Sequence, residues 1–101
     1  MQEKADEFYN DEQRILYFYT PLCGTCAVAE KYIKIVEEMD SVSEVRKLDI
    51  NYWPKLAEAW KIESVPCLIR IEKNNSTKKM YAMENVLKIY EFIRGDNNDR
   101  T

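Results

Sequence analysis

Histidine is absent from the 101-residue sequence. Its absence excludes the Cys-His and Ser-His pairs that activate nucleophiles in many enzymes, and it excludes every zinc site that requires an imidazole ligand. Glycine and proline are also scarce, with two and three residues respectively. A reactive side chain in this protein must therefore be activated without an imidazole.

Long hydrophobic runs are absent as well. No apolar run approaches the roughly 18 residues needed to span a bilayer, and residues 1–7 lack the basic-then-apolar order of a secretory signal. We therefore predict an untargeted cytoplasmic protein that does not enter a membrane. The net charge of −3, with both signs interspersed, argues against a nucleic-acid binder that relies on a basic surface.

The chain length and composition predict one domain. At 101 residues and 46% hydrophobic content, the chain can build a single continuous core, so residues 1–101 form one domain, of which 96–101 are a polar tail. The chain has three cysteines. In a reducing cytosol such cysteines tend to be catalytic or metal-binding, and a structural disulfide framework is not expected.

The order of apolar patterns predicts an α/β protein. Residues 14–20 are rich in aromatic and β-branched side chains without polar alternation, as in a strand that is covered on both faces. Residues 24–39 form the clearest helix, because apolar side chains recur at three- and four-residue spacing. The other predicted elements are a first helix at 3–10, strands at 44–50, 67–72 and 77–82, a short helix at 51–60, a turn at 73–76 and a last helix from Val86 to a cap at Gly95.

These elements assemble into a predicted mixed sheet of four strands with helices on both faces. The strand, helix and strand over 14–50 form a right-handed crossover between parallel strands. Asn74 and Asn75 can take positive φ in the turn between the last two strands, which are antiparallel. The buried stripes of the two long helices are predicted from Val28, Ala29, Tyr32, Ile33, Ile35, Val36 and Met39, and from Val86, Leu87, Ile89, Tyr90 and Ile93.

A Cys-x-x-Cys pair, Cys23 and Cys26, opens the long helix directly after the first strand. A helix N-terminus stabilises negative charge, so Cys23 is predicted to be the reactive thiolate and Cys26, one turn further in, the resolving thiol. Gly24 is expected to permit their close approach. The alternatives are a metal site, for which two ligands are too few, and an inert structural pair; redox chemistry is favoured because of the strand-to-helix position.

Val65 and Pro66 form a second signal about forty residues later, at the start of a strand. Proline cannot donate a ladder hydrogen bond, so the simplest interpretation is a strand entry or an edge position. The alternative is a cis bond that brings the backbone of Val65 beside the cysteine pair, where it could bind an extended substrate.

The stretch 18–26, which ends in Cys-Gly-Thr-Cys, and Val65-Pro66 together resemble the thioredoxin family, over roughly residues 12–95. The resemblance implies a thioredoxin-like fold without the extra N-terminal strand, and a thiol-disulfide oxidoreductase. It implies that Cys23 attacks a substrate disulfide and that Cys26 releases the mixed disulfide, without a cofactor. It also implies disulfide-containing protein substrates, a thioredoxin-reductase-type electron donor and a monomer.

Several residues depart from the family pattern. Leu22 stands where the family has tryptophan. Thr25 stands where the family has proline, and because residues between the cysteines tune the reduction potential, Thr25 predicts a more oxidising pair than in thioredoxin. Tyr17 occupies the position of a buried acid and is a poor base, with an ordinary pKa of about 10. Lys47, which the family also has near that acid, is expected to favour a thiolate.

Cys67 follows Pro66, where the family commonly has threonine. The simplest interpretation is a buried cysteine that behaves as a small apolar residue. The alternative is a third thiol near Cys23 and Cys26, available for an alternative disulfide or as a ligand of a metal or an iron-sulfur cluster. The second functional hypothesis is accordingly a non-enzymatic module of the same fold, either a redox-responsive adaptor or a metal- or iron-sulfur-binding module that uses Cys23, Cys26 and Cys67.

Overall fold

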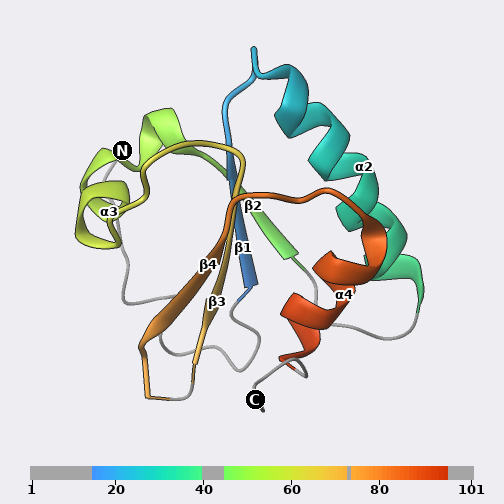
Figure 1. The fold of residues 1–101 in the computed structure, drawn as a ribbon. Coiled ribbons are helices and arrows are strands. Elements are labelled where there is room, and N and C mark those ends of the chain that lie inside the picture. The colour runs from blue at the N-terminus through green and yellow to red at the C-terminus, as the bar shows by residue number, and fades with distance from the viewer. Residues whose placement is uncertain (1–14, 40–44, 73, 96–101) are drawn as a thin grey trace.

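The computed structural model describes residues 15–39, 45–72 and 74–95. In these residues four strands form one sheet, surrounded by helices (Figure 1). The strands are β1 (Ile15–Tyr19), β2 (Val45–Asp49), β3 (Cys67–Ile71) and β4 (Thr77–Met80). The helices are α2 (Gly24–Met39), the 3-10 helix η1 (Ile50–Tyr52), α3 (Pro54–Ala59) and α4 (Val86–Arg94).

The sheet has the strand order β2-β1-β3-β4, which makes it mixed. β1 pairs in parallel with β2 and antiparallel with β3, and β4 pairs antiparallel with β3 at the edge. Parallel neighbours need a crossover connection, and α2 supplies it. The sheet therefore brings the end of β1, where the cysteines follow, next to the start of β3, where Pro66 precedes.

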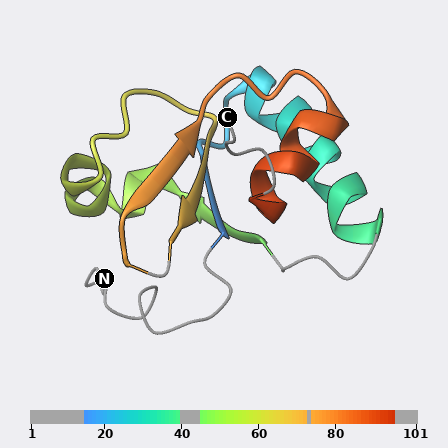
Figure 2. The same ribbon diagram turned by 60° about the horizontal axis from the view of Figure 1, so that its bottom comes forward.

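Helices cover both faces of the sheet, as Figures 1 and 2 show. On one face α2 and α4 pack over Ile15, Tyr17 and Leu68. On the other face Leu56 of α3 and Trp60, which follows the helix as its C-cap, pack against strand residues such as Phe18. Every buried residue of β1 thus has a cover, which explains why its sequence shows no polar alternation.

The predicted fold class and the four-stranded mixed sheet are confirmed, and so are the bounds of the helix over 24–39. Gly95 caps α4 in the left-handed conformation, at a φ of 76°, and Asn75 takes a positive φ in the turn before β4. The predicted helix at 3–10 and the polar tail at 96–101 lie outside the described residues.

Some details of the prediction were wrong. The segment at 51–60 divides into η1 and α3, and the last strand ends at Met80, two residues early. Four apolar residues assigned to buried helical stripes are instead about half exposed or more, namely Val28, Ile35, Met39 and Leu87. The buried stripes are narrower because each helix contacts the sheet along one line, through Ala29, Ile33 and Val36 of α2 and through Ile89, Phe92 and Ile93 of α4.

Candidate active site

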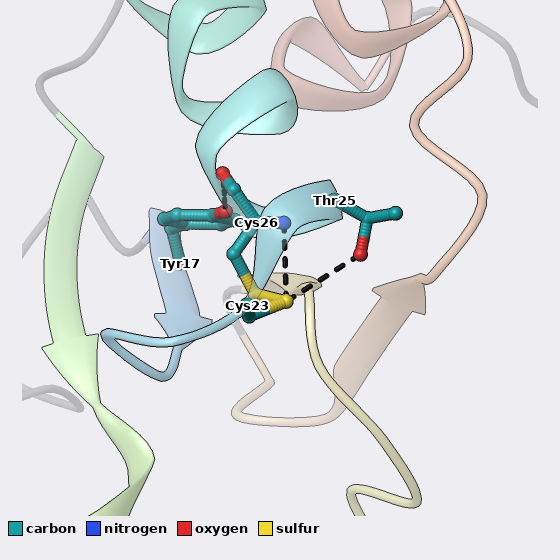
Figure 3. The surroundings of a disulfide bond; sticks show 4 residues. All are labelled: Tyr17, Cys23, Thr25 and Cys26. Carbon is teal, nitrogen blue, oxygen red and sulfur yellow. Dashed lines mark hydrogen bonds between the residues drawn. A yellow bond between two sulfur atoms is a disulfide. The ribbon is translucent and has the colours of Figure 1, made fainter.

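The cysteine pair lies where β1 turns into α2. Residues 20–22 leave the strand, Cys23 immediately precedes the helix, and Cys26 lies in its first turn. The two residues form a disulfide, with their Cα atoms 5.1 Å apart (Figure 3). The local backbone, from just before the helix into its first turn, is thus enough to bring the two cysteines within disulfide distance.

The two sulfurs differ in their access to solvent. Cys26 is buried, with 2% of its surface exposed, whereas Cys23 is partly exposed and next to Leu22, which is 99% exposed. The backbone N–H of Cys26 donates to Cys23 Sγ at 3.1 Å, and Thr25 Oγ1 lies 3.4 Å from the same sulfur. A thiolate at Cys23 would therefore face one backbone donor, one hydroxyl and the positive end of the α2 dipole.

Tyr17 lies beside the first turn of α2, with its hydroxyl toward Cys26 (Figure 3). Its side chain is fully buried, and its hydroxyl donates to the carbonyl oxygen of Cys26 at 2.6 Å. Burial raises the pKa of this hydroxyl further above its ordinary range, with a smaller contribution from the charge of Glu30. Tyr17 thus stays protonated at neutral pH and positions the backbone of Cys26.

Lys47 and Gly24 are the other two residues that the sequence predicts to support the cysteine pair. Lys47 is the strand neighbour of Tyr17, but its ammonium lies 3.9 Å from a carboxylate oxygen of Glu37. Glu37 is three turns along α2 from Cys26, so this structure does not bring the Lys47 charge to the cysteines.

The position of Gly24 has room for a side chain, because a Cβ added there would meet nothing within 4 Å. The role of Gly24 in the approach of the two cysteines therefore stays a prediction.

The Val65–Pro66 peptide bond is cis, as the second of the two interpretations has it. Both residues line a hollow of about 430 Å³, together with Thr25 and Val28 from the first turns of α2. The cis-proline segment and the first turns of α2 thus meet around one concave surface. The remaining wall comes from Ala29, Ser64, Tyr81, Ala82, Met83 and Glu84.

Residues 81–84 were missed by the sequence analysis, which assigned the first two to a strand. Because β4 ends at Met80, this segment crosses irregularly toward α4, buries Met83 against the α2 side of the sheet and leaves Glu84 exposed at the hollow. The only available signal was the polar Glu84-Asn85 pair ahead of the helix, where Asn85 is the N-cap.

Cys67 is fully buried on the opposite face of the sheet from α2, among Leu16, Phe18 and Trp60. Burial raises the pKa of its thiol to about 11, against smaller lowering effects of a hydrogen bond with Tyr81 and the charge of Lys79. In the described part of the chain, no group of three or more His, Cys, Asp and Glu residues is arranged to hold a metal ion. The structure thus does not bring Cys67 into one site with Cys23 and Cys26.

The fold and the site define a class of protein. A mixed sheet between helices, a disulfide at the N-terminus of the first crossover helix and a facing cis-proline are the framework of a disulfide-carrying thioredoxin fold. A family model, thioredoxin, matches residues 2–95, so the chain belongs to the thioredoxin family. The family and the Cys23-Cys26 pair together support thiol-disulfide oxidoreductase chemistry in general.

Known proteins are similar over most of the chain. The thioredoxin-like protein YusE of Bacillus subtilis is 36% identical over 94 residues, which cover 93% of this chain and 89% of YusE. Thioredoxin-1 of Drosophila melanogaster is 29% identical over 70% of this chain and 67% of its own length. Among solved structures, the germline-specific thioredoxin Deadhead of the same fly has a TM-score of 0.71 at 23% identity, covering 90% of this chain and 87% of its own.

A thioredoxin mutant from Halobacterium salinarum has a TM-score of 0.70 at 20% identity, covering 86% of this chain and 76% of its own. At sequence identities this low, the structural similarity shows a shared fold and nothing about function. In the described residues no helix is both long and apolar enough to cross a membrane.

Proposed function

We propose that this protein is a thiol-disulfide oxidoreductase that reduces protein disulfides in the cytoplasm through Cys23 and Cys26, and so serves cell redox homeostasis. The observation that carries the proposal is the asymmetry of the pair: Cys23 is partly exposed, accepts the N–H of Cys26 and begins a helix, whereas Cys26 is buried behind it. An attacking thiolate needs access and stabilisation, and a resolving thiol needs only to reach its neighbour.

The cycle transfers two electrons. The Cys23 thiolate attacks one sulfur of a substrate disulfide, and the other substrate sulfur leaves as a thiolate that takes up a proton. Cys26 then loses its proton and attacks Cys23 in the mixed disulfide, which releases the second substrate thiol. The protein is left with the Cys23-Cys26 disulfide, and a thioredoxin-reductase-type donor returns two electrons and two protons to it.

We propose that Val65 and Pro66 bind the substrate chain beside Cys23. In the described residues the backbone of Val65 has no hydrogen-bond partner, although the residue lies at a concave surface next to Thr25. An extended substrate could supply the missing partners by pairing with this backbone, as strand-adding peptides do.

A turnover assay tests this proposal with a protein held together by interchain disulfides as substrate and dithiothreitol as electron source. We expect Cys23→Ser to abolish turnover, and Cys26→Ser to abolish turnover while trapping a mixed disulfide on Cys23 that mass spectrometry detects. Cys67→Ser is the matched control and should retain turnover, because Cys67 is buried on the other face. Turnover that is indifferent to Cys23, or no turnover by the wild type, would refute the reductase and favour a redox-responsive adaptor.

A further inference from the structure

A second hollow lies between the edge strand β4 and α4, outside the cysteine site. Its volume is about 880 Å³, and its apolar lining residues include Phe92 and Met80. Four of its lining residues are cationic, namely Arg70, Lys78, Lys79 and Lys88, and one is anionic, Glu72. Because the ammonium of Lys79 lies on the other face of the sheet, the charges on the groove's own face sum to +2 (Arg70, Lys78 and Lys88 less Glu72), in a chain whose net charge is −3. We call these ten lining residues, completed by Tyr81, Ala82 and Gly95, the basic groove.

The charges in the basic groove are not all compensated. The charge of Arg70 is compensated: its guanidinium donates twice to Glu72, at 2.6 and 3.0 Å, and once to the carbonyl of Phe92, whose ring it also covers. Lys79 turns to the other face, where its ammonium donates to the carbonyl of Trp60 at 2.8 Å. These two cations are therefore already used within the fold.

Lys78 and Lys88 are different. Both are exposed, and in the described parts of the chain neither ammonium has a hydrogen bond or an ion pair. Lys78 is the direct cross-strand neighbour of Arg70, a like-charge arrangement that weakens a strand pair. Lys88 lies in the first turn of α4, whose N-terminal dipole adds to the positive potential. A negatively charged ligand would reduce the repulsion between Lys78 and Arg70 and would be attracted by the positive potential at Lys88.

The strand beside these lysines favours a polypeptide as that ligand. β4 is the edge of the sheet in the described residues, so its outer side has no strand beside it. Alternate residues of a strand direct both backbone groups to one side, so two of its four residues present N–H and C=O outward. An extended chain can add to such an edge, while lysines on it disfavour a neutral strand or a second copy of the same edge.

We propose that the basic groove binds an extended acidic segment of a partner protein. The segment pairs with the outer edge of β4, its carboxylates lie against Lys78 and Lys88, and apolar side chains between them contact Phe92 and Met80. The basic groove shares Tyr81 and Ala82 with the hollow that Thr25, Val65 and Pro66 line, so the two hollows adjoin at these residues. The proposal concerns binding alone and does not depend on the redox reaction.

Fluorescence anisotropy with the full chain tests the proposal. The probe is a labelled, cysteine-free peptide of roughly a dozen residues that alternates Glu with Thr and Val, and it is compared with the same peptide carrying Lys for Glu. We expect the Glu peptide to bind, more weakly as salt increases, and the Lys peptide not to bind. A version with N-methyl groups on alternate backbone nitrogens should bind less well, because it cannot complete the edge pairing.

Matched variants locate the site. Lys78→Glu with Lys88→Glu should weaken binding of the Glu peptide about tenfold or more. Lys31→Glu with Lys34→Glu makes the same change in net charge on the exposed side of α2 and should weaken it no more than about twofold. If circular dichroism shows that the reversed variant is unfolded, Lys78→Gln with Lys88→Gln replaces it, with the same direction expected.

Four results would overturn the proposal: no binding of the Glu peptide at low salt, equal losses in the two charge-reversed variants, full binding of the N-methylated peptide, and tighter binding of an oligonucleotide of the same charge. A dimer in sedimentation that dissociates when Lys78 and Lys88 are changed would likewise replace the acidic segment by a second copy of the chain.

Discussion

Thr25 is the side chain that contacts Cys23 Sγ directly, at 3.4 Å through its hydroxyl. In the reduced protein this hydroxyl can donate to the Cys23 thiolate alongside the N–H of Cys26. A donor to the thiolate stabilises the reduced form relative to the disulfide, which raises the reduction potential. A hydrogen bond of this kind contributes about 0.5–1.5 kcal/mol, which corresponds to roughly 10–30 mV for a two-electron couple.

We therefore expect Thr25→Val, which keeps the shape and removes the hydroxyl, to lower the reduction potential by about 10–30 mV. Equilibration with glutathione buffers measures it. Thr25→Ser keeps the hydroxyl and should stay close to the wild type. Equal shifts for Val and Ser would assign the effect to side-chain volume instead. We expect the reduction potential of the wild type to lie above the roughly −270 mV of thioredoxin. A value at or below roughly −270 mV would refute the prediction that threonine, in place of the family's proline, makes the pair more oxidising.

At the residue scale, the sequence predicts which residues lie at the candidate site better than it predicts what their side chains contact. The roles proposed for Cys23 and Cys26 rest on position alone, because a residue just before a helix and one a turn later have defined surroundings. The direction of a long side chain is not encoded in this way. Lys47 occupies the strand position next to Tyr17, yet its flexible stem carries the charge to Glu37, which the chain places at the far end of α2.

At the element scale, the first turn of α2 is the feature that presents the cysteines. Gly24 is the first residue of this helix, its φ is not in the left-handed region, and its missing Cβ would lie in open space. Glycine at this position thus loses more backbone entropy on folding than another residue would, although no neighbouring atom requires the absence of a side chain. We expect Gly24→Ala to raise the free energy of unfolding by about 0.4–1 kcal/mol, because alanine restricts the unfolded chain and fits the helix.

Urea denaturation of the oxidised protein measures this change. Gly95→Ala is the matched control and should destabilise the protein, since Gly95 holds a φ of 76° at the end of α4 and a Cβ there would contact Arg70. A loss of stability in Gly24→Ala comparable to that of Gly95→Ala would show that the glycine between the cysteines is required after all.

Element types were predictable from the sequence because periodicity reports burial, and the buried faces of α2 and β1 are continuous. Boundaries were less predictable where no core contact fixes them. β4 ends at Met80 because the chain must then leave the edge of the sheet to reach α4. The same departure builds the wall of the hollow around Met83 and Glu84. Its position depends on the tertiary arrangement, which the local sequence pattern does not report.

At the scale of the whole molecule, Cys67 couples stability to pH. It lies at 0% exposure in the core between the sheet and α3, and burial raises the pKa of its thiol to about 11. In the unfolded chain a cysteine titrates near about 8.5. The folded state therefore binds this proton more tightly, so its contribution to stability is complete below about pH 8.5 and is lost as the pH rises toward 11.

We accordingly expect the free energy of unfolding of the wild type to fall more steeply between about pH 8.5 and 11 than that of Cys67→Ala. Urea titrations of both proteins across this range measure the difference, with Cys23 and Cys26 kept as the disulfide so that neither titrates. The alanine variant should be less stable at pH 7, because it leaves a small cavity. The two curves should then converge as the pH rises, and parallel curves would show that the Cys67 thiol titrates equally in both states.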